Sequence, residues 1–123
     1  MFDRHLVRSI LLQVDEAISK IKARTEHIQN PDYFATPEGM EKLDAAAMLF
    51  MAIGESLKNI DKITGGTLLA RHPETDWRGV KGFREIIAHH YFDIDGEQVF
   101  WILKHELDPL SKAIKELIEE IAE

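Results

Sequence analysis

The chain has 123 residues, 45% of them hydrophobic and 30% charged, which fits one globular domain over residues 1–123 and excludes a disordered or fibrous protein. The net charge of −7 excludes a broadly basic nucleic-acid surface, and the lack of cysteine excludes disulfides and thiolate metal sites. No apolar run approaches the roughly 18 residues that a membrane helix needs, and the N-terminus lacks the form of a signal peptide, so we expect a cytoplasmic protein that does not bind membranes.

The first predicted helix covers residues 3–28. Its core-facing side chains are spaced alternately four and three residues apart, which is typical of a helix lying lengthwise in a bundle. These side chains are Val7, Leu11, Val14, Ile18, Ile21, Thr25 and Ile28. The next segment, Asn30 to Tyr33, contains Pro31 and is expected to end the helix.

The second predicted helix begins after Thr36, an N-cap residue followed by Pro37 at the first helical position, and runs to about Ile60. Its apolar face is wide enough to contact more than one neighbour. This face comprises Met40, Leu43, Ala46, Ala47, Phe50, Met51, Ile53, Gly54, Leu57 and Ile60. Gly54 costs roughly 1 kcal/mol relative to alanine in mid-helix, which predicts the close approach of another helix. Three methionines are expected in the core or at a dimer contact, not as ligands: Met40, Met48 and Met51.

The third predicted helix begins near Trp77, after a connection with a short helical piece at residues 67–71. Either Thr75 or Asp76 is expected to cap its N-terminus. Its core face is predicted to consist of Val80, Phe83, Ile86 and Ile87.

The last predicted helix follows a turn at residues 93–96, where Asp95 and Gln98 resemble a capping box. Its apolar side chains keep the spacing of three and four residues: Val99, Leu103, Leu107, Leu110, Ile114, Leu117 and Ile121. Pro109 removes the backbone hydrogen bond to the carbonyl of His105, which predicts a kink or a break. These segments predict an all-α fold, a four- to five-helix up-and-down bundle.

The side chains best suited to catalysis lie within eight residues of the sequence: Arg84, His89, His90 and Tyr91. Residues 71–90 carry a net charge of +1 and the remainder −8, so an anion is expected to bind in this segment if it binds at all. On a helix Arg84 and His89 are about 140° apart, which the reach of arginine can bridge. Tyr91 can join them if the helix ends near His89 and the chain then becomes extended, in which case His90 points elsewhere.

Arginine and histidine together suffice for RNA cleavage without a metal. Histidine titrates near neutral pH and can move the proton of a ribose 2′-hydroxyl, while Arg84 can bind the phosphate as its charge grows. A structural interpretation competes, in which His89 interacts with the helix dipole, Arg84 is a surface charge and Tyr91 lies at the core edge. Adjacent histidines on one helix cannot chelate one metal ion, so we expect neither a metal site nor a cofactor.

The pattern R-x-x-x-x-H-x-Y, filled by Arg84, His89 and Tyr91, resembles the motif of HepT-type proteins of the HEPN family. The resemblance extends over essentially the whole chain. Its further landmarks are Ile53-Gly54-Glu55, Trp77-Arg78, and Phe92 followed by Ile94-Asp95.

The resemblance implies a HEPN-like helical bundle that forms a homodimer, with the two motifs facing each other across a two-fold cleft. It implies a metal-independent endoribonuclease toxin of a type VII-like toxin–antitoxin pair, with Arg84 and His89 as catalytic residues. RNA would be the substrate. A cognate minimal nucleotidyltransferase of the MntA type would be the antitoxin, and Tyr91 would accept adenylate from it.

Several assignments around the motif stay open. Glu85 stands where many family members have Asn or Asp, so its role is undetermined, and His90 can replace His89 as the base if the register shifts by one. Arg78 and Glu85 are candidate auxiliary residues. Glu55 is a partner of an arginine, a residue that helps to position the motif, or, equally well, a plain surface charge. The alternative function is a non-catalytic subunit that binds a nucleotide or a nucleotidyltransferase, and a third is a purely structural helical dimer.

Overall fold

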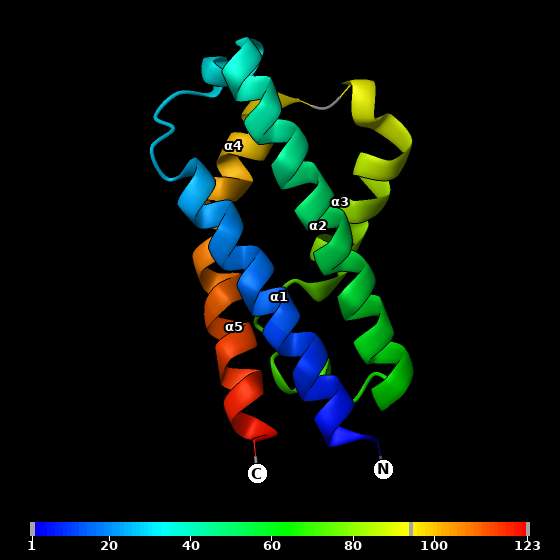
Figure 1. Ribbon diagram of the computed structural model, residues 1–123. Coiled ribbons are helices and arrows are strands. Elements are labelled where there is room, and N and C mark those ends of the chain that lie inside the picture. The colour runs from blue at the N-terminus through cyan, green and yellow to red at the C-terminus, as the bar shows by residue number, and fades with distance from the viewer. Residues whose placement is uncertain (1, 94, 123) are drawn as a thin grey trace.

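The computed structural model describes residues 2–93 and 95–122, apart from the side chains of Ile86, His89, His90 and Tyr91. Within this part of the chain the regular structure is entirely helical. The α-helices are α1 (Arg4–Thr25), α2 (Pro37–Thr64), α3 (Trp77–His90), α4 (Gly96–His105) and α5 (Leu107–Glu120). They run up and down, with α4 leading into α5 (Figure 1). The predicted all-α bundle is therefore confirmed.

Helix α1 is the rod that the apolar spacing predicted. Asp3 caps it, since its carboxylate accepts a hydrogen bond from the backbone N–H of Leu6 at 3.0 Å. Each side chain of the predicted stripe is buried: Val7, Leu11, Val14, Ile18, Ile21, Thr25 and Ile28. The stripe therefore faces the core along its full length.

A short 3-10 helix, Pro31–Ala35, precedes α2 and was not predicted. The Asn30 side chain accepts a hydrogen bond from the backbone N–H of Asp32, which is a local capping signal. The carbonyl oxygen of Tyr33 would lie 1.8 Å from a Cβ atom at Gly39, so only glycine lets this short helix rest on the first turn of α2. Helix α2 then runs one turn past the predicted end, to Thr64.

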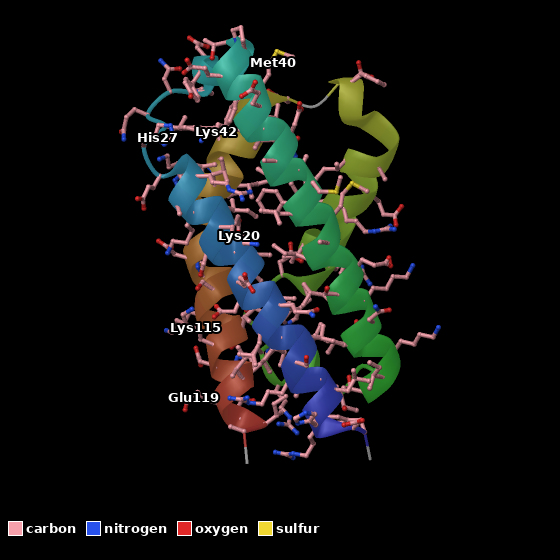
Figure 2. The ribbon with its side chains drawn as sticks, viewed as in Figure 1. Lys20, His27, Met40, Lys42, Lys115 and Glu119 are labelled. Carbon is pink, nitrogen blue, oxygen red and sulfur yellow. The ribbon has the colours of Figure 1, made fainter. Side chains whose placement is uncertain are left out.

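Two methionines predicted to be in the core are exposed. Met40 is 53% exposed and Met48 is 68% exposed, while Met51 packs partly buried against the core. Met40 lies in the first turn of α2, at the end of the bundle (Figure 2). Met48 lies about 200° around the helix from buried Phe50, which turns it away from the core. Their alternative placement at a dimer contact stays a prediction.

The caps and breaks of the C-terminal half follow local sequence. Asp76 caps α3, since its carboxylate accepts from the N–H of Gly79 at 2.9 Å, which decides between Asp76 and Thr75. The Asp95 carboxylate caps α4 through the N–H of Glu97. The chain breaks at Glu106, between α4 and α5, as expected from Pro109 three residues later.

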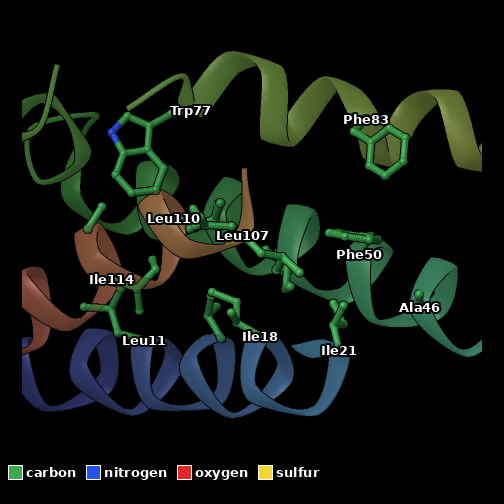
Figure 3. Packing of buried hydrophobic residues seen from close by; sticks show 14 of the residues in the cluster. Leu11, Ile18, Ile21, Ala46, Phe50, Trp77, Phe83, Leu107, Leu110 and Ile114 are labelled. Carbon is green, nitrogen blue, oxygen red and sulfur yellow. The ribbon is translucent and has the colours of Figure 1, made fainter. Parts of the chain in front are cut away.

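Helix α2 lies between α1 and α3, and α1 also packs against α5 (Figure 1). Figure 3 shows Leu11 and Ile18 of α1 directed toward the apolar side chains of α5. On the other side of α2, the rings of Phe50 and Phe83 meet edge to face at 5.2 Å. The main contact of α3 is therefore with α2, and this contact positions the candidate site.

Candidate active site on the third helix

Arg84 lies at a close approach of α3 to α2, at the position of Gly54. A Cβ atom added to Gly54 would lie 2.6 Å from the Cβ atom of Arg84 and 3.2 Å from its Cγ atom. Atoms in a packed interior do not approach so closely, so any larger residue at position 54 would displace α3. The predicted close approach at Gly54 is confirmed, and the neighbour is the motif arginine itself.

Two carboxylates contact the guanidinium of Arg84. Oε1 of Glu55, on α2, lies 3.3 Å from Nη2, and Oε1 of Glu85 accepts a hydrogen bond from Nη1 at 2.5 Å. The Arg84 side chain is 24% exposed, so solvent still reaches it. Glu55 is therefore the partner of an arginine and not a plain surface charge, and its role in positioning the motif stays a prediction. The structure also gives Glu85 a definite contact, with its neighbour in the chain.

The motif histidines and tyrosine are located by their backbone alone. His89 and His90 are the last residues of α3, and Tyr91 begins a 3-10 helix, Tyr91–Asp93. The expectation of an extended chain after His89 is wrong, because a 3-10 turn continues the helix, as is common at helix ends. The three side chains lie outside the described residues, so the choice between His89 and His90 stays a prediction.

The helical backbone sets the distance between the two proposed catalytic positions. Arg84 and His89 are both within α3, which places their Cα atoms about 7.5 Å apart along the helix axis. Arg78 is exposed in the first turn of α3, about 9 Å along the axis from Arg84. Its auxiliary role stays a prediction.

Much of the positive charge in residues 71–90 is already paired. Arg71 lies 3.8 Å from the carboxylate of Glu120, and buried His72 places Nε2 2.7 Å from the same carboxylate. Lys81 pairs with Asp61 of α2. Arg84 is itself paired with two carboxylates, so the expectation that this segment binds an anion stays a prediction.

A cavity of about 650 Å³ lies between α3 and the α4–α5 pair, apart from Arg84. Its apolar lining includes Val80, Phe83 and half-exposed Trp101. Its acidic lining residues are Glu74, Asp76, Glu106 and Glu116. Because these carboxylates repel phosphate, the cavity is a poorer place for an RNA backbone than the surface at Arg84.

Neither a metal-binding group nor a membrane-spanning helix occurs in the part of the chain that the structure describes. No three His, Asp or Glu side chains among the described residues are gathered so as to hold a metal ion. None of the described helices is both long and apolar enough to cross a membrane.

Comparison with known proteins points to one family. The family model described as "Ribonuclease HepT-like" matches residues 14–117. The protein named "Putative RNase MJ0127" of Methanocaldococcus jannaschii is 30% identical over 69 residues, which are 56% of this chain and 54% of that protein. "Putative RNase TTE0752" of Caldanaerobacter subterraneus is 26% identical over 68 residues, 55% of this chain and 57% of that protein. The chain thus spans little more than half the length of these relatives, and no solved structure matches it.

Proposed function

The chain belongs to the HepT-like ribonuclease family, and from this membership we propose that it is a metal-independent endoribonuclease acting through Arg84 and His89. The family match over residues 14–117 carries the proposal, because it includes both the motif on α3 and the Gly54-Glu55 step of α2 that contacts Arg84. The names of the two relatives agree with this activity.

The proposed reaction is a transesterification within the RNA chain. The imidazole of His89 takes the proton of a ribose 2′-hydroxyl, and the 2′ oxygen then attacks the adjacent phosphorus. The bond from phosphorus to the 5′ oxygen breaks, which leaves a 2′,3′-cyclic phosphate and a 5′-hydroxyl. Arg84 stabilises the charge that grows on the phosphate oxygens. In a homodimer the acid is the His89 of the second copy, which as an imidazolium protonates the leaving 5′ oxygen.

The cleavage assay uses a mixed-sequence single-stranded RNA oligonucleotide with a fluorophore and a quencher at its ends, in buffer with EDTA. Arg84→Ala and His89→Ala should each lower the rate about 10²–10⁴-fold, the usual cost of losing a positioned acid–base group. The matched controls are Arg24→Ala and His105→Ala, whose side chains are exposed and distant from the motif in sequence.

The variants also separate the alternatives. Full activity in His89→Ala with loss in His90→Ala would transfer the role of base to His90. Wild-type protein that binds the oligonucleotide without cutting it would favour the non-catalytic subunit. Strict dependence on an added metal ion would contradict the proposed mechanism.

We further propose that the enzyme is a toxin whose antitoxin is a minimal nucleotidyltransferase that adenylylates Tyr91. Adenylate would bring a phosphodiester and about one negative charge into the neighbourhood of Arg84, where the substrate phosphate must bind. The family membership and the place of Tyr91 directly after α3 support this proposal.

Intact-mass analysis tests this control. After incubation with the proposed nucleotidyltransferase antitoxin, ATP and magnesium, the chain should gain adenylate-sized mass and lose its activity. Tyr91→Phe should gain none, and Tyr33→Phe, the change at the other tyrosine, should gain it as wild type does. Additions that map elsewhere, or inhibition without any addition, would overturn the covalent mechanism and leave the ribonuclease proposal standing.

A further inference from the structure

We propose that the Gly54-Glu55 step of α2 positions the motif arginine, with Gly54 setting where α3 sits and Glu55 setting how the Arg84 guanidinium points. The inference rests on the proposed function for its effect on catalysis, while its effect on the side chain itself is independent of that function. Neither residue touches the substrate in this scheme; both act through Arg84.

Gly54 fixes the place of the arginine stem. A Cβ atom at this position would meet three successive carbons of Arg84, Cβ at 2.6 Å, Cγ at 3.2 Å and Cδ at 3.3 Å. The first of these belongs to the root of the side chain and cannot move without the α3 backbone. The aliphatic part of Arg84 therefore lies directly on the glycine.

Glu85 bonds Nη1 from within α3, and Glu55 holds Nη2 of the same guanidinium from α2. The Glu55 carboxylate lies 3.3 Å from Nη2, and it comes from a different helix than the arginine. A free arginine side chain has many rotamers, and this freedom is lost on binding when the substrate phosphate must order the side chain. Glu55 adds a hold from α2 to the one that Glu85 makes within α3, so the guanidinium is ordered before RNA arrives, and N–H groups of this five-donor fork are left for the phosphate.

A second ion pair of the same kind joins α2 to α3 and provides the comparison. Asp61 of α2 pairs with Lys81 of α3, three residues before Arg84, and the two side chains are 28% and 31% exposed. If Glu55 served only to attach α3 to α2, its loss and the loss of Asp61 would have the same consequences. If Glu55 positions Arg84, loss of Glu55 should lower kcat, whereas loss of Asp61 should not.

The decisive comparison is Glu55→Ala against Glu55→Gln. Both variants remove the same negative charge, so the attraction of RNA to the site, and with it KM, should change equally in both. Only glutamine keeps an oxygen at the place from which Glu55 contacts Nη2 at 3.3 Å. With the fluorogenic RNA oligonucleotide, kcat should fall at least about tenfold in Glu55→Ala relative to Glu55→Gln, the scale of loss expected when a catalytic group is misplaced.

Asp61→Ala is the matched control and should leave kcat unchanged. Gly54→Ala should lower kcat, whereas Gly82→Ala should not, because a Cβ atom at Gly82 meets nothing within 4 Å. Equal kcat in Glu55→Ala and Glu55→Gln, or an equal fall in Glu55→Ala and Asp61→Ala, would overturn the positioning role.

A readout without RNA keeps this inference separate from the ribonuclease proposal. In ¹⁵N-labelled protein the Arg84 guanidinium signals, assigned by their loss in Arg84→Lys, should be well dispersed in wild type, Glu55→Gln and Asp61→Ala. In Glu55→Ala they should collapse toward the values of a freely rotating arginine. Unchanged signals in Glu55→Ala contradict the inference even if the enzyme cleaves RNA; collapsed signals support it even if no cleavage is found.

Discussion

At the scale of single residues, the two mid-helix glycines nearest the site have opposite surroundings. Gly54 is in contact with Arg84, whereas the space around Gly82 is open and its backbone φ is not positive. Glycine lowers the stability of a helix interior because it loses more backbone freedom on folding than other residues do. At Gly54 the lost stability is offset, because only glycine allows the contact between α2 and α3. At Gly82 no contact offsets it.

We therefore expect Gly82→Ala to raise the free energy of unfolding by about 0.5–1 kcal/mol, the difference in helix propensity. Gly54→Ala gains the same propensity but must displace Arg84, so it should lower the free energy of unfolding. Urea unfolding followed by circular dichroism measures both. A stabilised Gly54→Ala protein would show that α3 can move away from α2 at little cost.

His72 is a buried polar residue with a structural contact. Its Nε2 atom bonds the Glu120 carboxylate at 2.7 Å, and its carbonyl accepts a hydrogen bond from the Trp77 indole at 3.0 Å. These bonds join the segment before α3 to the end of α5. These bonds hold the start of α3 from a second side and so support the packing of Arg84, further along α3, against Gly54 of α2.

Glu120→Ala should lower the free energy of unfolding by about 1–3 kcal/mol, because it leaves a buried imidazole nitrogen without its partner. Glu119→Ala is the control, since Glu119 is an exposed neighbour at the outer face of α5 (Figure 2). Thermal or urea unfolding compares the two. Equal stability of both variants would mean that water replaces Glu120 fully.

At the scale of the helices, packing decides which of the large apolar residues of one helix are buried and which are exposed. Leu57 and Met48 are both large apolar residues of α2, but Leu57 is fully buried and Met48 is 68% exposed. Truncating a buried leucine removes apolar contacts and leaves a cavity, whereas an exposed methionine has few contacts to lose. The two faces of α2 should therefore respond differently to the same change.

Leu57→Ala should cost about 2–5 kcal/mol of unfolding free energy. Met48→Ala should stay within about 0.5 kcal/mol of wild type when measured at a protein concentration at which the chain is monomeric. A large, concentration-dependent loss in Met48→Ala would instead place Met48 in the contact between two copies.

At the scale of the whole molecule, charge is the main constraint on the proposed reaction. The chain has a net charge of −7, and Arg84 is itself accompanied by Glu55 and Glu85. Each copy brings one positive side chain, Arg84, and two negative ones, Glu55 and Glu85, so a cleft between two copies is not positively charged at this place. On the proposed function, RNA binding would rest on local, oriented donors and not on net charge.

The proposed composite site requires two copies of the chain. Light scattering at micromolar concentration should therefore give twice the mass of one chain. Mixing the inactive variants Arg84→Ala and His89→Ala should restore part of the activity if each site takes groups from both copies. A monomer that cleaves RNA at full rate would contradict the composite site while leaving the roles of Arg84 and His89 intact.

Local sequence determined most of the secondary structure. The spacing of apolar residues predicted α1, α2, α3 and the α4–α5 rod, and Asp3, Thr36, Asp76 and Asp95 cap the helices that follow them. The motif residues were likewise found without a structure, because their types and spacing are properties of the sequence alone. Hydrogen bonds within one turn and the periodicity of one helix depend only on near neighbours, so they can be predicted from the sequence.

Only the tertiary structure decided which distant residues meet. The sequence indicated that a helix approaches Gly54, but not that Arg84 is the neighbour. It left Glu55 undecided between a partner of an arginine, a residue that positions the motif and a surface charge. It gave no sign that His72 bonds Glu120, 48 residues later. Such pairs depend on how whole helices pack, and periodicity tells which face of a helix is buried without telling what that face contacts. The step that holds Arg84 is a pair of this kind, formed because α2 and α3 pack together at Gly54.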